Sequence, residues 1–218
     1  KKRYFSRLYC GFKKAVEHAR AIICVSDATK NDLMSLPLKL PKSLTTIYEG
    51  VEERFWHGIT EHERRLIRLQ LGTNDPYLLY VGVWMNHKNI PRLLAAYSLA
   101  LKKYPSLKLV LTGRPQPGYV PVDQETRRLG LSSDQVLFMD HINDQLLPAL
   151  YQEAVALLFP SLYEGFGLPA LEAAAGGTPV ITSNVTSLPE ITRGAALCVN
   201  PESILDIAQA IDLVVSDQ

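Results

Sequence analysis

From Pro76 onward the sequence alternates short apolar runs with segments of helical periodicity. The apolar runs are hydrophobic on successive residues, as is typical of strands that are covered on both faces. This alternation predicts an α/β fold with a doubly wound parallel sheet, whose ligand-binding loops share the edge at the carboxyl ends of the strands. The predicted strands are 77–82, 107–113, 136–140, 155–161, 179–183 and 195–199, and the predicted helices are at about 89–103, 122–130, 143–153, 169–176 and 202–215.

The first 60 residues follow a different pattern. Two strands and two helices are too few to bury a sheet independently, so we interpret residues 1–60 as the C-terminal part of an incomplete domain. Residues 61–75 read as a charged connecting helix, and residues 76–218 as the complete domain. Because the chain begins at Lys1 without a methionine, we expect it to be a piece of a longer protein. The elements predicted in the first part are a basic helix at about 3–18, a strand at 21–26, a helix from Ser26 and a strand at 44–50.

Charge and cysteine content exclude some classes of protein. The formal net charge of +1 argues against a general nucleic-acid binder. Cys10, Cys24 and Cys198 lie far apart without a CxxC pair, so the cysteines predict no metal site. Cys24 and Cys198 stand in apolar runs and are expected to be buried. No apolar run approaches the ~18 residues of a membrane span, and we expect a reducing, cytoplasmic location.

The first 20 residues hold seven Lys or Arg and one Glu. A helix of this composition suits peripheral contact with anionic lipid at the inner face of a membrane. The alternative, which we favour, is a helix that is solvated or packed against another part of the protein. Pelleting with vesicles that contain or lack anionic lipid would separate the two interpretations.

A glycine-rich turn, "FPSLYEGFGLPALEAAAGG", joins a predicted strand to a helix of small residues. Glycine tolerates positive φ in such a turn, Pro169 suits the first helical turn, and Gly176–Gly177 ends the helix. The amides of Phe166, Gly167 and Leu168 are then expected at the helix N-terminus. Free N–H groups and the positive end of the helix dipole favour phosphate there.

Two glutamates flank this turn. Glu172 lies about one turn inside the helix, ~5–6 Å along its axis, where a carboxylate can accept hydrogen bonds from the hydroxyls of a ribose. Glu164 lies on the rim of the same crevice. Amides for phosphate and two carboxylates together predict a site for a nucleotide sugar. The competing interpretation is that Glu164 is a solvated loop charge and that Glu172 forms a local cap or ion pair. For a single glutamate this interpretation would be the better one, but two glutamates that flank a glycine-rich turn favour a functional site.

A second segment, "YLLYVGVWMNHKNIPRLL", also reads as strand, loop and helix. Asn89 is predicted to be the N-cap of this helix. Lys88 lies at the same sheet edge, where a cation would neutralise a pyrophosphate and stabilise it as it leaves. A merely solvated lysine is the alternative. Arg114 after the next strand is a weaker candidate of the same kind, and Asp140 and His141 are candidates for a base pocket by position alone.

These segments together resemble the retaining GT-B glycosyltransferases of family 4, the glycosyl transferases group 1. The hallmark of that family is a Glu–seven residues–Glu motif, which Glu164 and Glu172 match. The resemblance extends from Phe159 to "AALCVNPES", and "YVGVWMNHKNIPRLLAAY", which includes Gly82, resembles the phosphate-binding segment. "IICVSDATKNDL" and "IYEGVEERF" resemble the end of the N-terminal domain. Within the family, the chain resembles bacterial mannosyl- and rhamnosyltransferases of surface polysaccharide synthesis.

The resemblance implies a hexosyltransferase that needs no metal and no cofactor. It would move sugar from a nucleotide-sugar donor, GDP- or UDP-linked, to a saccharide or lipid-linked acceptor. Glu172 would bind the donor ribose, Glu164 would lie near the reacting face of the sugar, and Lys88 would hold the pyrophosphate. The amides at 166–168 would contact the sugar and phosphate.

The same resemblance implies how the chain is divided. Residues 1–60 would be acceptor-side, and 76–218 would be the donor-binding domain without its final crossover helix. Such a fragment is expected to bind the donor weakly and to transfer sugar poorly or not at all.

Two departures and two alternatives stay open. Val83 stands where many members carry arginine after the glycine that matches Gly82, and Asp140 replaces the usual glycine of the base-side loop. A GT-B phosphorylase or epimerase relative is one alternative, although no segment marks a lysine for pyridoxal phosphate. A non-catalytic nucleotide-binding module is the other, and sugar transfer by the complete protein would distinguish it from an enzyme.

Overall fold

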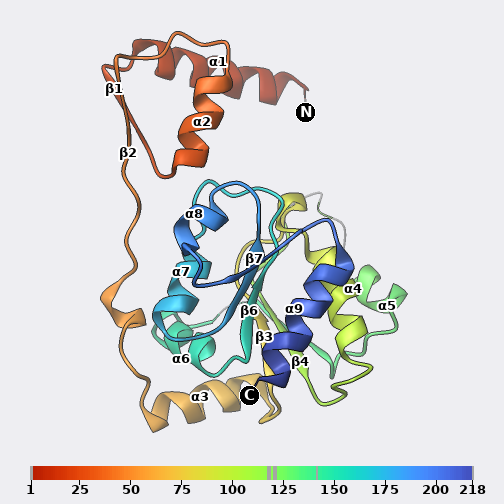
Figure 1. Cartoon of the computed structure of the whole chain (residues 1–218). Coiled ribbons are helices and arrows are strands. Elements are labelled where there is room, and N and C mark those ends of the chain that lie inside the picture. The colour runs from red at the N-terminus through yellow and green to blue at the C-terminus, as the bar shows by residue number, and fades with distance from the viewer. Residues whose placement is uncertain (1, 117–118, 120–121, 141, 218) are drawn as a thin grey trace. The chain divides into compact units, whose positions relative to one another are not determined.

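The computed structural model describes residues 2–116, 119, 122–140 and 142–217 (Figure 1). The chain forms two compact units, Lys1–Gly50 and Val51–Gln218. None of the helices within the described ranges is both long and apolar enough to cross a membrane.

The first unit consists of two helices and two strands. The strands lie where the sequence pattern predicts them, and they pair in parallel, with Ala21 opposite Ser43. Ser26 begins the second helix, because its Oγ accepts a hydrogen bond from the Thr29 amide at 3.0 Å. The elements are α1 (Lys2–His18), β1 (Ala21–Cys24), α2 (Asp27–Ser35) and β2 (Ser43–Thr46).

The second unit is built on a six-stranded parallel sheet with the order β5-β4-β3-β6-β7-β8. Leu78 of β3 pairs with Leu109 of β4 on one side and with Ala156 of β6 on the other, so the strand order reverses between β3 and β6. This is the predicted doubly wound α/β fold, in which ligands bind outside the carboxyl ends of the strands at that reversal. The strands are β3 (Tyr77–Tyr80), β4 (Lys108–Thr112), β5 (Val136–Met139), β6 (Ala156–Phe159), β7 (Val180–Ser183) and β8 (Leu197–Val199).

The burial of the strands follows their place in the sheet. Every residue of β3, β4, β6 and β7 is buried, whereas β5 and β8 at the two edges are partly exposed. The prediction of a buried Cys198 is therefore wrong, because this residue stands on the edge strand β8 and is exposed. Cys24 is buried as predicted.

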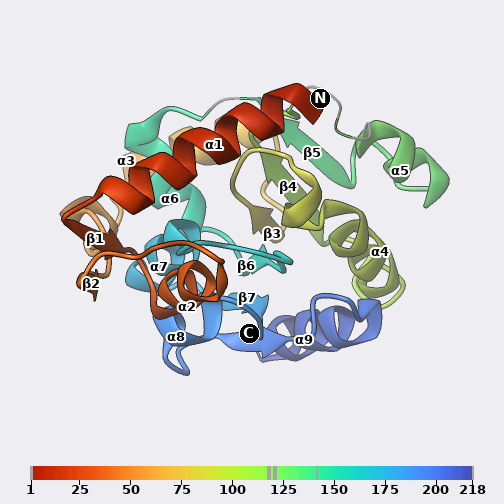
Figure 2. The ribbon, with the colours of Figure 1, turned by 90° about the horizontal axis from the view of Figure 1, so that it is seen from above.

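Helices flank the sheet on both faces (Figures 1 and 2). α4 (Ile90–Ala100) and α9 (Ile204–Ser216) pack together on one side, and α6 (Leu147–Gln152) and α7 (Leu168–Ala175) on the other. Ala170 and Ala173 of α7 are fully buried, which lets the helix approach the sheet closely. The pattern did not predict the short α8 (Leu188–Thr192). The remaining elements are α3 (Glu61–Leu71), α5 (Val122–Arg128) and the 3₁₀ turns η1 (Glu53–Phe55), η2 (Asn86–Lys88) and η3 (Asp144–Leu146).

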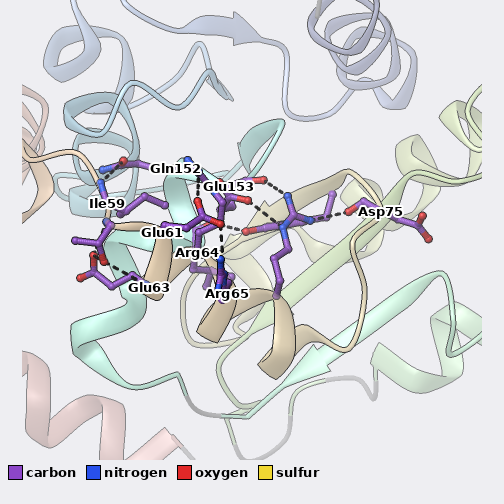
Figure 3. A network of polar contacts seen from close by, with 12 residues as sticks. Ile59, Glu61, Glu63, Arg64, Arg65, Asp75, Gln152 and Glu153 are labelled. Carbon is purple, nitrogen blue, oxygen red and sulfur yellow. Dashed lines mark hydrogen bonds and ion pairs between the residues drawn. The ribbon is translucent and has the colours of Figure 1, made fainter.

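The helix α3 is fastened to the end of α6 by a polar network (Figure 3). The carboxylate of Glu153 receives Arg64 Nε at 2.7 Å and Arg68 Nε at 2.9 Å. Thr60 and Glu63 form a capping box that begins α3. These contacts make α3 part of the second unit.

The division between the units lies earlier than the boundary near residue 60 that the sequence pattern suggested. It falls between Gly50 and Val51, so the segment before α3 also belongs to the second unit. Phe55 of η1 is 1% exposed in its core, and Gln152 bonds to the backbone of His57 and Ile59. The buried Phe55 and these hydrogen bonds bring residues 51–60 into the second unit.

Candidate functional site

An ion pair joins the loops that follow β3 and β6, where the strand order reverses. Lys88 Nζ lies 2.6 Å from Glu164 Oε1, and it also lies 5.0 Å from the centroid of the Phe159 ring. The two charged side chains are only 15% and 11% exposed. The amide of Leu162 donates to His87 O at 2.7 Å and ties the same loops together. A solvated surface charge is therefore the wrong interpretation for both Lys88 and Glu164.

Asn89 is the N-cap residue of α4 as predicted, but its side chain has another role. Its side chain makes no capping bond; its Nδ2 donates to Pro160 O at 2.9 Å and to Pro201 O at 2.7 Å. The residue is 2% exposed and has a φ of 61°, a left-handed conformation that asparagine tolerates. Asn89 thus joins the loops after β3, β6 and β8 and fixes the backbone next to Lys88.

The glycine-rich turn ends at Gly167, the residue before α7. Its φ is 125°, and a Cβ there would come within 2.7 Å of Leu188 Cδ2, so only glycine fits without displacement. Pro169 stands in the first turn of α7 as predicted. In the described part of the chain, no hydrogen bond has the amide of Gly167 or Leu168 as its donor. Phe166 is buried at 6% exposure in the same turn.

A loop after β7 holds this turn in place. Ser187 Oγ lies 2.6 Å from Phe166 O and 3.0 Å from Glu164 O, and Ser187 is fully buried. Thr186, with a φ of 57°, accepts a hydrogen bond from the Glu164 amide at 3.2 Å. The sequence pattern marks neither hydroxyl residue, because nothing in their spacing indicates that they contact a turn 22 residues away.

Glu172 lies one turn inside α7 and is held from α6. Tyr151 donates its hydroxyl to Glu172 Oε2 at 2.8 Å. Burial raises the pKa of Glu172 above the usual glutamate value, and the nearby Glu52 also raises this pKa. The hydrogen bond from Tyr151 and the charge of Arg54 act in the opposite direction. The carboxylate is thus partly desolvated, with one oxygen committed to the protein.

The loops after β3 and β4 meet at two glycines. A Cβ on Gly113 would lie 2.3 Å from Gly82 O, and Gly113 has a φ of 95°. Arg114 and Asp140 face one another, with 3.6 Å between Arg114 Nη2 and Asp140 Oδ2, and both are well exposed. Among the ion pairs of the described residues, neither Arg114 nor Asp140 contacts Lys88 or Glu164. His141 lies outside the described residues.

The chemical groups at this edge suit a ligand with both anionic and hydroxyl groups. The Lys88 ammonium and the amides of Gly167 and Leu168, which donate no bond to the described protein, suit a phosphate, whereas the carboxylates of Glu164 and Glu172 suit hydroxyls. Among the described residues, no group of three His, Cys, Asp or Glu is arranged to hold a metal ion.

The fold and the position of these residues define a Rossmann-like α/β domain of the type found in GT-B glycosyltransferases. Residues 63–218 match the family described as Glycosyl transferases group 1, and the chain belongs to this family.

One relative and two solved structures illustrate the similarity. The serotype-specific mannosyltransferase WbdA of Escherichia coli is 30% identical over 220 residues, which are 98% of this chain and 27% of WbdA. The structure of sucrose-phosphate synthase from Thermosynechococcus elongatus has a TM-score of 0.79 and 29% identity, over 94% of this chain and 51% of that one. Anabaena HepE in complex with UDP-glucose shares the fold, with a TM-score of 0.82 and 21% identity, over 93% and 56% of the two chains. The chain thus spans between a quarter and somewhat more than half of these proteins.

Proposed function

We propose that this chain is the donor-binding part of a retaining, metal-independent family 4 glycosyltransferase. The donor is a GDP- or UDP-sugar, with mannose as the favoured sugar, and the acceptor is a saccharide or a lipid-linked saccharide. Membership of the group 1 family and the similarity to WbdA, which is named as a mannosyltransferase, support the activity. The complex of HepE with UDP-glucose supports a nucleotide-sugar donor on this fold.

The observation that carries this proposal is the Lys88–Glu164 pair at the reversal of strand order, beside the amides of Gly167 and Leu168. A diphosphate brings negative charge, which an ammonium and the N-terminus of a helix stabilise. In this proposal Lys88 leaves Glu164 for the diphosphate, and Glu164 turns to the donor sugar. Glu172 accepts hydrogen bonds from the ribose hydroxyls.

Transfer with retention follows from a front-face reaction. The bond between the anomeric carbon and the diphosphate oxygen breaks, and its electron pair leaves with the diphosphate. The acceptor oxygen then bonds to the anomeric carbon on the same face, and its proton passes to the departing phosphate oxygen. Lys88 stabilises the charge that develops on the leaving group, so this step needs no divalent cation.

Calorimetric titration of the 218-residue chain with UDP, GDP and dTDP tests the site. One of them should bind, and Lys88→Ala should weaken that binding by about tenfold or more, since a charge-assisted contact is lost. Lys103→Ala is the matched control, because Lys103 is 60% exposed and pairs with Asp212 on the surface. Equal loss in both variants, or no loss in either, would refute the assignment of Lys88.

Sugar transfer needs a separate measurement. The longest form of the protein that its gene encodes should transfer sugar at the same rate with and without EDTA, and the product should keep the anomeric configuration of the donor. Nucleotide binding without any transfer would favour a non-catalytic nucleotide-binding module instead.

A further inference from the structure

Tyr151 is the residue on which the position of the Glu172 carboxylate depends. Its hydroxyl donates to Glu172 Oε2 at 2.8 Å, and its side chain is fully buried. Phe55 packs edge-on against its ring with 5.9 Å between centroids. The hydroxyl of Thr178 donates to Tyr151 O at 2.8 Å. Ring and backbone are therefore held from two sides, and the hydroxyl has a fixed direction.

We propose that Tyr151 is a positioning residue, which occupies one oxygen of Glu172 and leaves the other for the vicinal hydroxyls of a ribose. This inference rests on the proposed nucleotide-sugar site and extends it to a residue on another helix. Among the hydrogen bonds of the described residues, Glu172 Oε1 accepts none. A carboxylate with one oxygen anchored presents the other in a defined orientation, which lowers the ordering cost of binding a diol.

The charges around Glu172 give this role a measurable signature. The groups that act on the pKa of Glu172 are the Tyr151 hydroxyl from α6, Glu52 just before η1 and Arg54 within η1. Tyr151 and Arg54 favour the ionised carboxylate, whereas burial and Glu52 favour the protonated form. Removing the Tyr151 hydroxyl should therefore raise the pKa of Glu172 further. Because the ionised carboxylate is the stronger acceptor for the ribose hydroxyls, tight binding should then need a higher pH.

Tyr151→Phe separates this role from a purely structural one. The variant keeps the ring that packs against Phe55 and removes only the hydroxyl, so a space-filling role would be preserved. The probes are UDP and 2′-deoxy-UDP, or GDP and 2′-deoxy-GDP if the chain prefers guanine, titrated calorimetrically into the whole chain between pH 5.5 and 8. The ratio of the two affinities measures the contact with the ribose and not the overall stability.

We expect the unaltered chain to prefer the ribonucleotide by about tenfold at pH 6, since a hydrogen bond to a charged group is lost with the deoxy form. In Tyr151→Phe the preference should fall below about threefold at the acid end of this pH range and recover in part as the pH rises. Arg54→Gln, which leaves the Tyr151 hydroxyl in place, should move the pH dependence in the same direction. It serves as the second variant if Tyr151→Phe does not fold.

The Glu172→Gln variant distinguishes failure of the proposed function at Glu172 from failure of the positioning role of Tyr151. If Glu172→Gln keeps the full ribonucleotide preference, the assignment of Glu172 in the proposed function is wrong. If Glu172→Gln abolishes the preference while Tyr151→Phe and Arg54→Gln retain it at every pH, only the role of Tyr151 is refuted. In the double variant Tyr151→Phe/Glu172→Gln, the first change should add no further loss of preference.

Discussion

Lys88 Nζ lies 2.6 Å from Glu164 Oε1, although 76 positions separate the two residues in the sequence. The contact bridges the loops after β3 and β6, which are neighbours only because the strand order reverses there. A lysine and a glutamate of low exposure thus neutralise one another at the edge of the sheet where ligands bind in this class of fold.

Breaking this pair on one side should destabilise the protein. Lys88→Met leaves the carboxylate of Glu164 with little exposure and without its partner, which should lower the free energy of unfolding by about 3 kcal/mol. The double variant Lys88→Met/Glu164→Gln should recover most of that loss, because no unpaired charge remains. Urea unfolding measures both. The idea fails if the double variant is less stable than the single one.

Ser187 should be required for the order of the turn before α7. Ser187→Ala removes the hydroxyl that contacts Glu164 O and Phe166 O, and two carbonyls then lose a buried donor. The free energy of unfolding should fall by about 1–3 kcal/mol, and amide hydrogen exchange should accelerate in residues 164–168. Ser216→Ala is the control, since its exposed hydroxyl donates to Leu213 O within its own helix. Unchanged exchange in residues 164–168 would argue against this role.

Gly113 should not tolerate a side chain. In Gly113→Ala a Cβ would lie 2.3 Å from Gly82 O on a backbone with a φ of 95°, so both the clash and the conformation are unfavourable. Gly130→Ala isolates the second effect, because Gly130 has a φ of 69° and no atom near the new Cβ. We expect a loss of about 1–2 kcal/mol for Gly130→Ala and a clearly larger loss for Gly113→Ala, measured by urea unfolding. Equal losses would show that the two loops move apart easily.

Glu172 should stabilise the fold less at neutral pH than at acid pH. Burial raises the pKa of this carboxyl, so the folded chain binds its proton more tightly than the unfolded chain does. The contribution is therefore greatest below the ordinary pKa of glutamate and declines as the pH rises through the raised value. Glu172→Gln keeps an oxygen for the Tyr151 hydroxyl, and at pH 8 it should be at least as stable as the unaltered chain.

A carboxylate with the opposite shift provides the control. Arg128 lowers the pKa of Glu125, so that residue contributes stability at neutral pH that is lost as the pH falls through the lowered value. Glu125→Gln should therefore reduce stability at pH 8 and have little effect at low pH. Urea unfolding at several pH values checks both signs, and a destabilised Glu172→Gln at pH 8 would contradict the argument.

The sequence predicted the elements of the fold well. Successive apolar residues marked β3, β4, β6 and β7, since a strand covered on both faces must be hydrophobic at every position. The turn before α7 was also predictable, because glycine at 167 permits positive φ and proline at 169 favours the first turn of a helix. The sequence pattern was misleading where the environment of a residue depends on parts of the chain that are distant in sequence. Cys198 stands in an apolar run that became an edge strand. Asn89 is the N-cap residue of α4, but its side chain bonds to two distant loops and does not cap the helix.

What the sequence determined by itself was most of the strands and helices and the glycine-rich turn before α7, because periodicity and backbone preference act over a few residues. Tertiary structure alone decided that Lys88 faces Glu164, that Ser187 holds the turn and that Tyr151 anchors Glu172. These side chains come from different elements of the fold. Their contacts depend on the order in which the strands pair. The energy of that pairing is distributed over the whole sheet, so no single segment of the sequence indicates it.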